Sequence, residues 1–248
     1  MLKSAGVDSI LIDQFDYASL FMRRQAEWSG ELALDSGSYR AFKKHLDLSN
    51  PRQFARYVQI SQDRNFSLKV AIDVIGEAMQ SLFNWDDLKR QGRFMPVWCW
   101  GTEPDDLRTY LRESELFSDG TVGIGGLVPV LRQEGRKRDD AIALLEDLCK
   151  EHPNRFHIFG ACRVQAINRL APHVRSLDSS IWLSGRKRRE LIFIHSQTGK
   201  LHRAPVGAVH EHFGCAEWTG EEISIQNARN IQTYFSMAQW RNHDLRDP

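Results

Sequence analysis

The stretch TVGIGGLVPVLRQEGRKRDDAIALLEDLCKEHPNRFHIFG, residues 121–160, decides the fold class of this 248-residue chain. Its two ends, 121–127 and 155–160, are short apolar runs that indicate buried strands. Between them, 138–152 has the spacing of an amphipathic helix. The apolar residues of that helix fall on one face: Ile142, Leu145, Leu148 and Cys149. A strand, a helix and a further strand in this order indicate a parallel sheet with crossover helices.

The same alternation recurs along the rest of the chain. Other apolar runs that end in polar or glycine-containing turns lie at 9–13, 31–37, 67–76, 94–101, 174–180 and 190–195. Helical patterns cover 104–117 and, with a capped start, 220–242. Eight candidate strands in about 250 residues favour a single-domain (β/α)8 TIM-like barrel over 1–248, with 220–242 as an extra C-terminal helix. A doubly wound open sheet is the alternative.

Composition excludes several classes of protein. The chain has 33 Lys and Arg against 32 Asp and Glu, a net charge of +1, and 42% hydrophobic residues. It therefore has ample apolar material for a core, and bulk positive charge cannot hold it to nucleic acid, although a local basic patch can. No apolar run reaches the length of a membrane span, and the N-terminus lacks the pattern of a secretion signal. The cysteines share no short spacing, so we expect no disulfide framework and a reducing, cytoplasmic location.

Polar residues at the ends of the expected strands are the candidate chemistry. Asp35, Asp73 and Asp178 each stand where a strand passes into its loop, and Gly125 and Gly126 form a turn at another strand end. In a barrel these ends converge on one mouth. Converging carboxylates can serve as nucleophile, general acid/base and base-recognition acceptor in glycosyl chemistry. A single aspartate before a helix can equally be an N-cap.

Five motifs in this region resemble those of one enzyme family. Asp35-Ser36-Gly37-Ser38-Tyr39 is similar to the DSGGFQ or DSGGYQ motif of the tRNA-guanine transglycosylases. The other four are VAIDVIG at 70–76, VGIGGLVP at 122–129, RFHIFGACRVQAINRLAP at 155–172 and LDSSIW at 177–182. Their order and approximate spacing match the family across 31–195, and the chain looks closer to phage and bacterial DNA-modifying relatives than to the tRNA enzymes.

The resemblance implies a role for each matching residue. Asp178 would be the nucleophile that attacks C1′ and forms a covalent glycosyl-enzyme, and Asp35 the general acid/base. Asp73 would accept hydrogen bonds from the amidine-like edge of guanine or a 7-deazaguanine. The rest of the implied substrate-binding set is Ser36, Gly37, Trp100, Gly125, Gly126, Leu127 and His157. The implied reaction exchanges guanine in DNA, or in tRNA or other RNA, for a free 7-deazaguanine base such as a preQ-type precursor, with no cofactor.

Two departures from the family pattern leave questions open. Trp100 stands in Val97-Trp98-Cys99-Trp100-Gly101, where the family often has a glutamine that recognises the base, so the base specificity is open. The family's zinc signature of three cysteines and a histidine is missing. Only Cys215 follows Asp178, near His210 and His212 in HEHFGC. We therefore expect no metal, with a site at these three residues as the alternative.

A basic run follows the candidate nucleophile: Arg186, Lys187, Arg188 and Arg189. In the family such a run contacts the nucleic-acid backbone, whereas a solvated turn is the plainer interpretation. A second run, 132–138, could supply phosphate contacts as well. The target nucleotide would be flipped out or single-stranded, and Trp100 and Trp182 are candidates for stacking. A homodimer or a partner protein stays open.

Other functions remain open from the sequence alone. The covalent step could end with water or with a different base. The chain could also be a nucleic-acid-binding relative without activity, although binding alone needs neither Asp35 nor Asp178. An unrelated barrel enzyme acting on a small metabolite is the remaining alternative.

Overall fold

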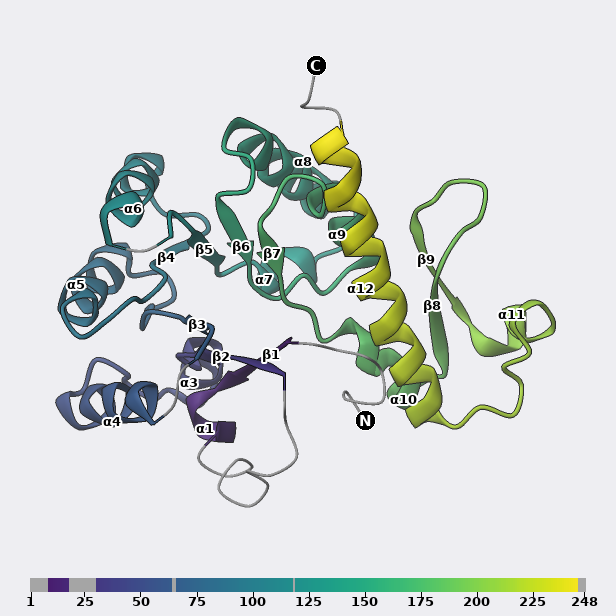
Figure 1. The fold of residues 1–248 in the computed structure, drawn as a ribbon, viewed down its shortest axis with the longest axis horizontal. Helices are drawn as coiled ribbons and strands as arrows, with labels where there is room; N and C mark the ends of the chain where they lie inside the picture. The colour runs from purple at the N-terminus through teal and green to yellow at the C-terminus, as the bar shows by residue number, and fades with distance from the viewer. Residues whose placement is uncertain (1–8, 18–29, 64–65, 118, 245–248) are drawn as a thin grey trace. The chain divides into compact units, whose positions relative to one another are not determined.

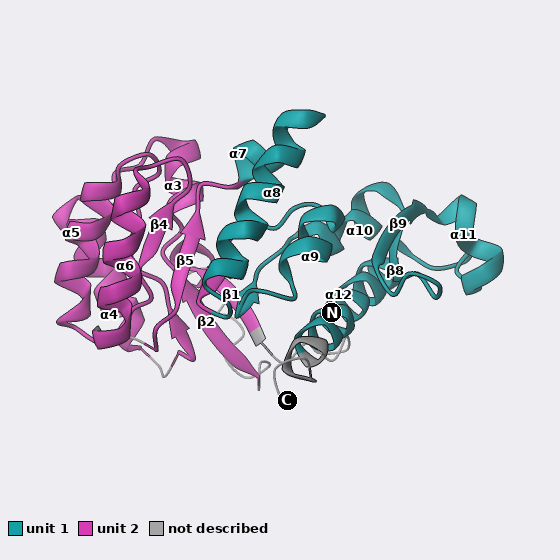
Figure 2. Cartoon of the chain, turned by 90° about the horizontal axis from the view of Figure 1, so that it is seen from above, with its two compact units in different colours: residues 1–7, 128–154, 160–248 teal, residues 8–127, 155–159 magenta. Residues whose placement is uncertain are grey.

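The computed structural model describes residues 9–17, 30–63, 66–117 and 119–244. The chain divides into two compact units (Figure 2). Unit 2 consists of residues 8–127 and 155–159, and unit 1 consists of residues 1–7, 128–154 and 160–248.

Unit 2 holds a series of parallel strands. β1 (Ser9–Asp13) pairs with β2 (Glu31–Asp35), and β2 pairs with β3 (Leu68–Lys69). A parallel bridge between Val70 and Met95 leads on to the next three strands. These are β4 (Val97–Cys99), β5 (Val122–Gly125) and β6 (Phe156–Ile158), paired in that order. Each strand therefore lies beside the next strand along the chain, and the order does not reverse as it does in a doubly wound sheet.

Helices connect the strands of unit 2. They are α1 (Gln14–Asp16), α3 (Ser38–Lys44), α4 (Pro51–Gln62), α5 (Ala78–Lys89) and α6 (Pro104–Phe117). Helices α4, α5 and α6 lie side by side along the strands (Figure 1). Between α5 and α6 the fully buried rings of Trp85 and Tyr110 stack with centroids 6.1 Å apart. Burial of two such large rings stabilises the helix layer that supports the strand ends.

Apolar side chains fill the other side of these strands. Val70, Met95 and Val97 form a buried cluster, against which Phe159 packs. Gly123 is required here because a Cβ on it would lie 2.6 Å from the ring of Phe159. The strands are thus packed on both sides, as expected of parallel strands in α/β proteins.

Unit 1 contains the remaining elements. They are α7 (Val128–Leu131), α8 (Arg136–Glu151), α9 (Val164–Leu170), β7 (Ser176–Leu177), η3 (Ile181–Leu183), α10 (Ser184–Arg188), β8 (Glu190–Ile194), β9 (Leu201–Pro205), α11 (Val206–Phe213) and α12 (Gly220–Asp244). The long helix α12 runs beside α10 and β8 (Figure 1). A buried apolar cluster of Leu191, Val206, Cys215 and Ile223 joins the hairpin β8–β9 to α11 and α12.

Asparagine side chains cover both edges of the hairpin. Asn227 of α12 accepts a hydrogen bond from the N–H of Ile192 at 2.6 Å, and Asn230 donates to the carbonyl of the same residue at 2.7 Å. On the other edge, Asn168 of α9 donates to the carbonyl of Leu201 and accepts from its N–H, both at 2.8 Å. These amides satisfy strand groups that would otherwise invite another strand.

Most expected elements are confirmed. The expected helices at 104–117, 138–152 and 220–242 correspond to α6, α8 and α12, and the expected strand at 9–13 is β1. The strands at 67–76 and 174–180 shrink to the two-residue strands β3 and β7. The parallel strand expected at 190–195 is wrong in direction, because β8 pairs antiparallel with β9. No helix among the described residues has the length and apolar character needed to cross a membrane.

Candidate functional site

The end of β2 carries the first group of predicted residues. Asp35 is the last residue of the strand and is half-buried, and Ser36 and Gly37 lead into α3. Gly37 has φ +77°, and a Cβ on it would lie 2.8 Å from the ring of Phe15. Only glycine fits this turn, because it combines a left-handed backbone with close contact to a ring. This turn fixes the backbone that directly follows Asp35 at the end of β2.

Asp73 lies at the same edge of the strands, four residues beyond the end of β3. It is 9% exposed, and Ser36 Oγ donates to its Oδ1 at 3.3 Å. Ser36 Oγ in turn lies 2.7 Å from Ser38 Oγ. Burial raises the pKa of the Asp73 carboxyl above its ordinary value, while hydrogen bonds from Ser38 and Ser36 act in the opposite direction. Asp73 is therefore a desolvated acceptor held by two hydroxyl groups.

The end of β1 adds residues that the sequence analysis did not single out. Gln14 is 1% exposed and donates from Nε2 to the carbonyl of Ser36 at 2.6 Å. Asp13 lies in register with Asp35, caps the N-terminus of α1, and pairs with Arg40 at 3.0 Å. The register of β1 against β2 brings Asp13 and Gln14 to the site. The run SILIDQ by itself predicts only that a strand ends here, so the sequence did not identify these residues.

The ends of β4 and β5 bring glycine backbone close to Asp73. A Cβ on Gly125 would lie 3.0 Å from Val97 Cγ1 and 3.3 Å from Asp73 Oδ2, and one on Gly126 would lie 2.7 Å from Cys99 Sγ. Gly126 also has φ +72°, and the N–H of Trp100 donates to the carbonyl of Gly125 at 3.0 Å. Both positions therefore favour glycine, because neighbouring side chains already fill the space that a Cβ would take.

Two predicted substrate-binding residues lie further inside. His157 on β6 is in register with Gly123, two residues before Gly125 on β5, and its ring packs edge-on against Phe159 at 4.5 Å. Burial lowers the pKa of His157 to about 4, so the imidazole is neutral at physiological pH. Leu127 is 2% exposed and belongs to the apolar core. His157 therefore lies inside the strands rather than at their end, and the side chain of Leu127, just after the Gly125–Gly126 turn, is buried.

Asp178 directly follows β7 in unit 1. The backbone N–H of Gly160 donates to its Oδ1 at 2.7 Å, and the N–H of Ala161 donates to its carbonyl at 2.9 Å. Ser179 Oγ donates to the carbonyl of Ala161 at 2.6 Å. Burial raises the pKa of the Asp178 carboxyl to about 6, and the hydrogen bond from Gly160 opposes that rise. The two predicted segments that contain Gly160 and Asp178 are therefore tied together by three hydrogen bonds.

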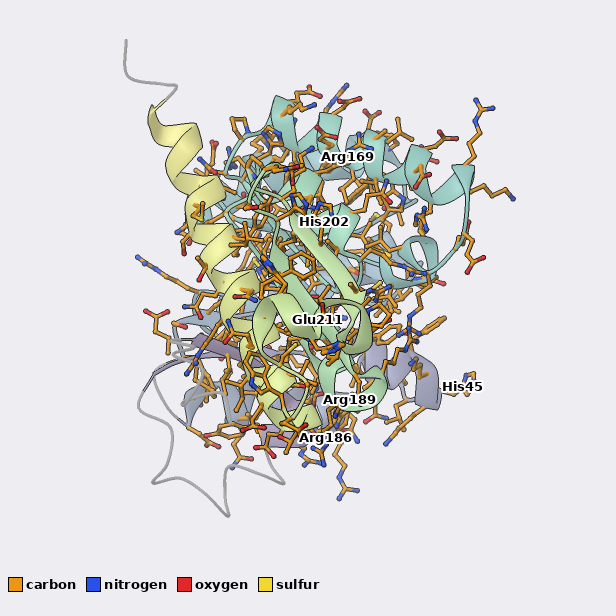
Figure 3. The ribbon with its side chains drawn as sticks, turned by 90° about the vertical axis from the view of Figure 1, so that its right-hand side faces the viewer. His45, Arg169, Arg186, Arg189, His202 and Glu211 are labelled. Carbon is orange, nitrogen blue, oxygen red and sulfur yellow. The ribbon has the colours of Figure 1, made fainter. Side chains whose placement is uncertain are left out.

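The basic run after Asp178 forms α10 and its end. Arg186, Lys187 and Arg188 are exposed, and none has an ion pair with the acidic residues that the structure describes. Arg189 differs, because its guanidinium donates to the carbonyls of Trp218 and Ala216 at 3.0 and 3.2 Å. Figure 3 labels Arg186 and Arg189 on the same side of unit 1. The three exposed cations are therefore available to a polyanion, whereas Arg189 has a structural role.

The second basic run is partly neutralised by nearby acidic residues. Arg136 lies 3.6 Å from Asp140, and Arg138 lies 2.9 Å from Asp139. This run therefore offers less free positive charge to a polyanion than α10 does.

The candidate metal residues are not assembled. Cys215 is fully buried in an apolar cluster, whereas His212 is exposed on α11. Within the described ranges, no group of three or more His, Cys, Asp or Glu side chains could hold a metal ion.

Most of the candidate residues predicted at strand ends lie near others of the set within their own unit. In unit 2 the set is Asp35, Ser36, Gly37, Asp73, Trp100, Gly125 and Gly126, and in unit 1 it is Gly160 with Asp178. A scan against protein-family models and a search of the curated proteins found no match for this chain.

Proposed function

We propose that the chain is a base-exchange glycosyltransferase that replaces guanine in DNA or RNA with a 7-deazaguanine. The observation that carries this proposal is the environment of Asp73, a buried carboxylate that accepts a hydrogen bond from Ser36 and lies close to the backbone of Gly125. An ionised carboxylate accepts hydrogen bonds only, and guanine offers an N1–H and an amine on one edge. That edge would pair with Asp73, with the flat ring lying against the glycine backbone.

Asp178 would act as the nucleophile. With a pKa near 6 its carboxylate is mostly ionised at neutral pH, and the N–H of Gly160 fixes one of its two oxygens. A desolvated and oriented carboxylate suits attack on an anomeric carbon, because it loses little hydration in the transition state.

The exchange would proceed in two balanced steps. In the first, an Asp178 oxygen bonds to C1′ while the C1′–N9 bond of guanine breaks, and Asp35 delivers a proton to the departing base. In the second, N9 of the incoming base bonds to C1′, the ester to Asp178 breaks, and the N9 proton passes to Asp35. Two inversions give retention at C1′.

We also infer that the parallel strands close into a barrel related to the (β/α)8 fold, in which the antiparallel hairpin β8–β9 takes no part. The support is the order of the six strands of unit 2, all parallel and each next to its sequence neighbour, which is the order of a singly wound barrel. A crystal structure in which β1 closes on a later strand would confirm the barrel, and an open sheet edge at β1 would contradict it.

The function is tested by release of labelled guanine. DNA and a tRNA transcript, each carrying radiolabelled guanine, are incubated with the full chain, with and without free 7-deazaguanine base. Release that depends on the free base supports base exchange, and release without it indicates an N-glycosidase. No release from either polymer would overturn the proposal.

The matched variants are Asp178→Asn and Asp87→Asn. Asp87 is an exposed aspartate on α5, so its variant should release guanine at the wild-type rate. Asp178→Asn should lose several orders of magnitude in rate, as commonly follows the loss of a covalent nucleophile. The wild-type enzyme, but not Asp178→Asn, should also give a covalent protein–nucleic acid band on a denaturing gel.

A further inference from the structure

A row of aromatic rings crosses one face of the β8–β9 hairpin. Phe193 on β8 and His195 just beyond its end are two residues apart and so point to the same face, and His202 on β9 is the register partner of Phe193. The ring centroids of Phe193 and His202 are 6.1 Å apart, and those of His202 and His195 are 4.8 Å apart with planes inclined by 34°. At the other end of the row, Phe213 of α11 lies 5.0 Å from Phe193.

Part of this row is accessible. His202 is exposed and His195 is half-buried, whereas Phe193 and Phe213 pack against the buried cluster beneath them. His202 lies within the row, between Phe193 and His195, so neighbouring rings on both sides hold it in place. An exposed ring held in this way is a surface against which another flat ring can pack.

The segment of chain that carries the row is positively charged. Residues 184–213 contain six Lys and Arg against two Glu, a net charge of +4 in a chain whose total is +1. Glu190 forms an ion pair with Arg203 at 3.7 Å. Lys200 lies opposite His195 in the hairpin and is exposed, and none of the described acidic residues forms an ion pair with it. Figure 3 shows His202, Glu211, Arg189 and Arg186 on the same side of unit 1.

Part of each edge of the hairpin is already occupied. Asn227 and Asn230 bond the backbone groups of Ile192, Asn168 bonds those of Leu201, and Pro205 ends β9 without an N–H to offer. A protein partner that adds a strand is therefore disfavoured, and the accessible feature is the face with its rings and cations.

We propose that this face of the β8–β9 hairpin binds unpaired nucleic acid, with a base stacked on His202 and the backbone beside Lys200. Exposed rings among cations are the general means by which proteins hold single strands without reading their sequence. The inference deepens the proposed function and rests on it for the identity of the polymer, since it names where an unpaired stretch of that polymer binds. It does not depend on any chemistry at Asp178.

Binding is measured on the full chain by fluorescence anisotropy, with labelled oligo(dT) of about 15 nucleotides and no free base present. His202→Ala should weaken binding by roughly 5- to 100-fold, the range expected for loss of one stacked base. His202→Phe keeps the ring and should bind within about twofold of wild type, which separates stacking from charge. Because His202 is exposed, the thermal midpoint of each variant should match that of wild type.

Two further arms separate the base from the phosphate. An abasic oligonucleotide of the same length should bind more weakly than oligo(dT) and should not distinguish His202→Ala from wild type. Lys200→Ala should lower the salt slope by about 0.7, whereas Lys44→Ala, an exposed lysine on α3, should leave it unchanged. Wild-type affinity in His202→Ala, or equal affinity for the abasic strand, would overturn the inference. Failure of guanine release with these binding results intact would overturn only the proposed function.

Discussion

The carboxylate of Asp178 is subject to two opposing effects. Burial pushes the carboxyl toward its neutral form, while the N–H of Gly160 favours the ionised form. A nucleophile needs this balance, because a fully hydrated carboxylate must lose water before it can attack and a fully buried one stays protonated. The same balance makes a prediction for stability as well as for rate.

Guanine release should increase with pH as Asp178 ionises, with an apparent pKa of about 6. The free energy of unfolding should move the other way. Between about pH 4 and 6 the native carboxyl holds a proton that the unfolded one has lost, so the native state binds more protons and stability falls as pH rises. Asp178→Asn removes this effect and should be more stable than wild type above pH 6, by at most about 3 kcal/mol. Denaturant melts at pH 4 and pH 8 check this, and equal wild-type and variant stability at pH 8 would contradict it.

Asp73 should determine the affinity for the incoming base. Asp73→Ala removes an acceptor that faces two donors in a desolvated place, which costs about 2–5 kcal/mol in base affinity. Exchange should still occur at high base concentration, since Asp178 is unchanged. The measurement is the dependence of exchange rate on free-base concentration for wild type and variant. An unchanged half-saturation, or a wild-type preference for adenine, would show that Asp73 does not read guanine.

Sequence reasoning reached these aspartates because their position depends only on local order along the chain. Each stands at the end of an apolar run, and within unit 2 the parallel strands bring their carboxyl ends to one edge. Gln14 could not be found in this way. Its partner is the backbone carbonyl of Ser36, and that hydrogen bond depends on the register of β1 against β2, which no pattern within either strand fixes.

At the scale of elements, α12 takes the place of a neighbouring strand beside β8. Asn227 is fully buried, and it bonds the N–H of Ile192 and the carbonyls of Glu190 and Trp182. A helix cannot offer its own backbone to a strand, so these side-chain amides satisfy the strand edge instead.

Asn227→Ala should lower the free energy of unfolding by about 1–3 kcal/mol, because it leaves several buried strand groups without partners. Ser236→Ala, at an exposed position on the same helix, is the control and should have no measurable effect. Urea unfolding followed by tryptophan fluorescence makes the comparison. An Asn227→Ala protein as stable as the control would mean that water replaces the amide at this edge.

Helix α10 should contribute charge rather than specificity. Neutralising Arg186, Lys187 and Arg188 together should weaken binding of every nucleic-acid sequence alike, and the salt slope should fall by roughly 0.7–0.9 for each phosphate that is no longer neutralised. Arg189→Ala should instead lower the thermal midpoint, because its guanidinium bonds carbonyls of the α11–α12 connection. Titrations at several salt concentrations and thermal melts check the two statements, and an unchanged slope in the triple variant would make α10 a solvated turn.

The direction of β8 depends on information outside its own apolar run. The run at 190–195 is a good strand in itself, yet its connection to β9 spans only 195–200. A parallel pairing needs a crossover of about a dozen residues or more, so a connection this short can only form a hairpin. The sequence signal for the hairpin is Gly199, which has φ +62° in the turn and lies beyond the end of the run.

At the scale of the whole molecule, the near-neutral total conceals an uneven distribution of charge. The segment 184–213 has net charge +4, which leaves the remaining residues at −3 in a total of +1. Association with nucleic acid should therefore be oriented, with the basic segment leading and the rest repelled.

Folding of the whole chain should not depend on zinc. Cys215 lies fully buried among Leu191, Val206 and Ile223, where its side chain acts as a small apolar group. Dialysis against a chelator should therefore leave the thermal midpoint and guanine release unchanged, and elemental analysis should find well under one zinc per chain. Stoichiometric zinc whose removal unfolds the protein would instead assign His210, His212 and Cys215 as ligands.

Because the side-chain amide of Asn227 covers a strand edge, a slow covalent reaction of that amide would affect the fold. Hydrolysis of the Asn227 amide would exchange its donor nitrogen for oxygen, and the carbonyls of Trp182 and Glu190 would then face a negative charge. Unlike unfolding, this change is not undone by cooling or refolding. A single buried amide thus links the hairpin to a chemical change that refolding cannot reverse.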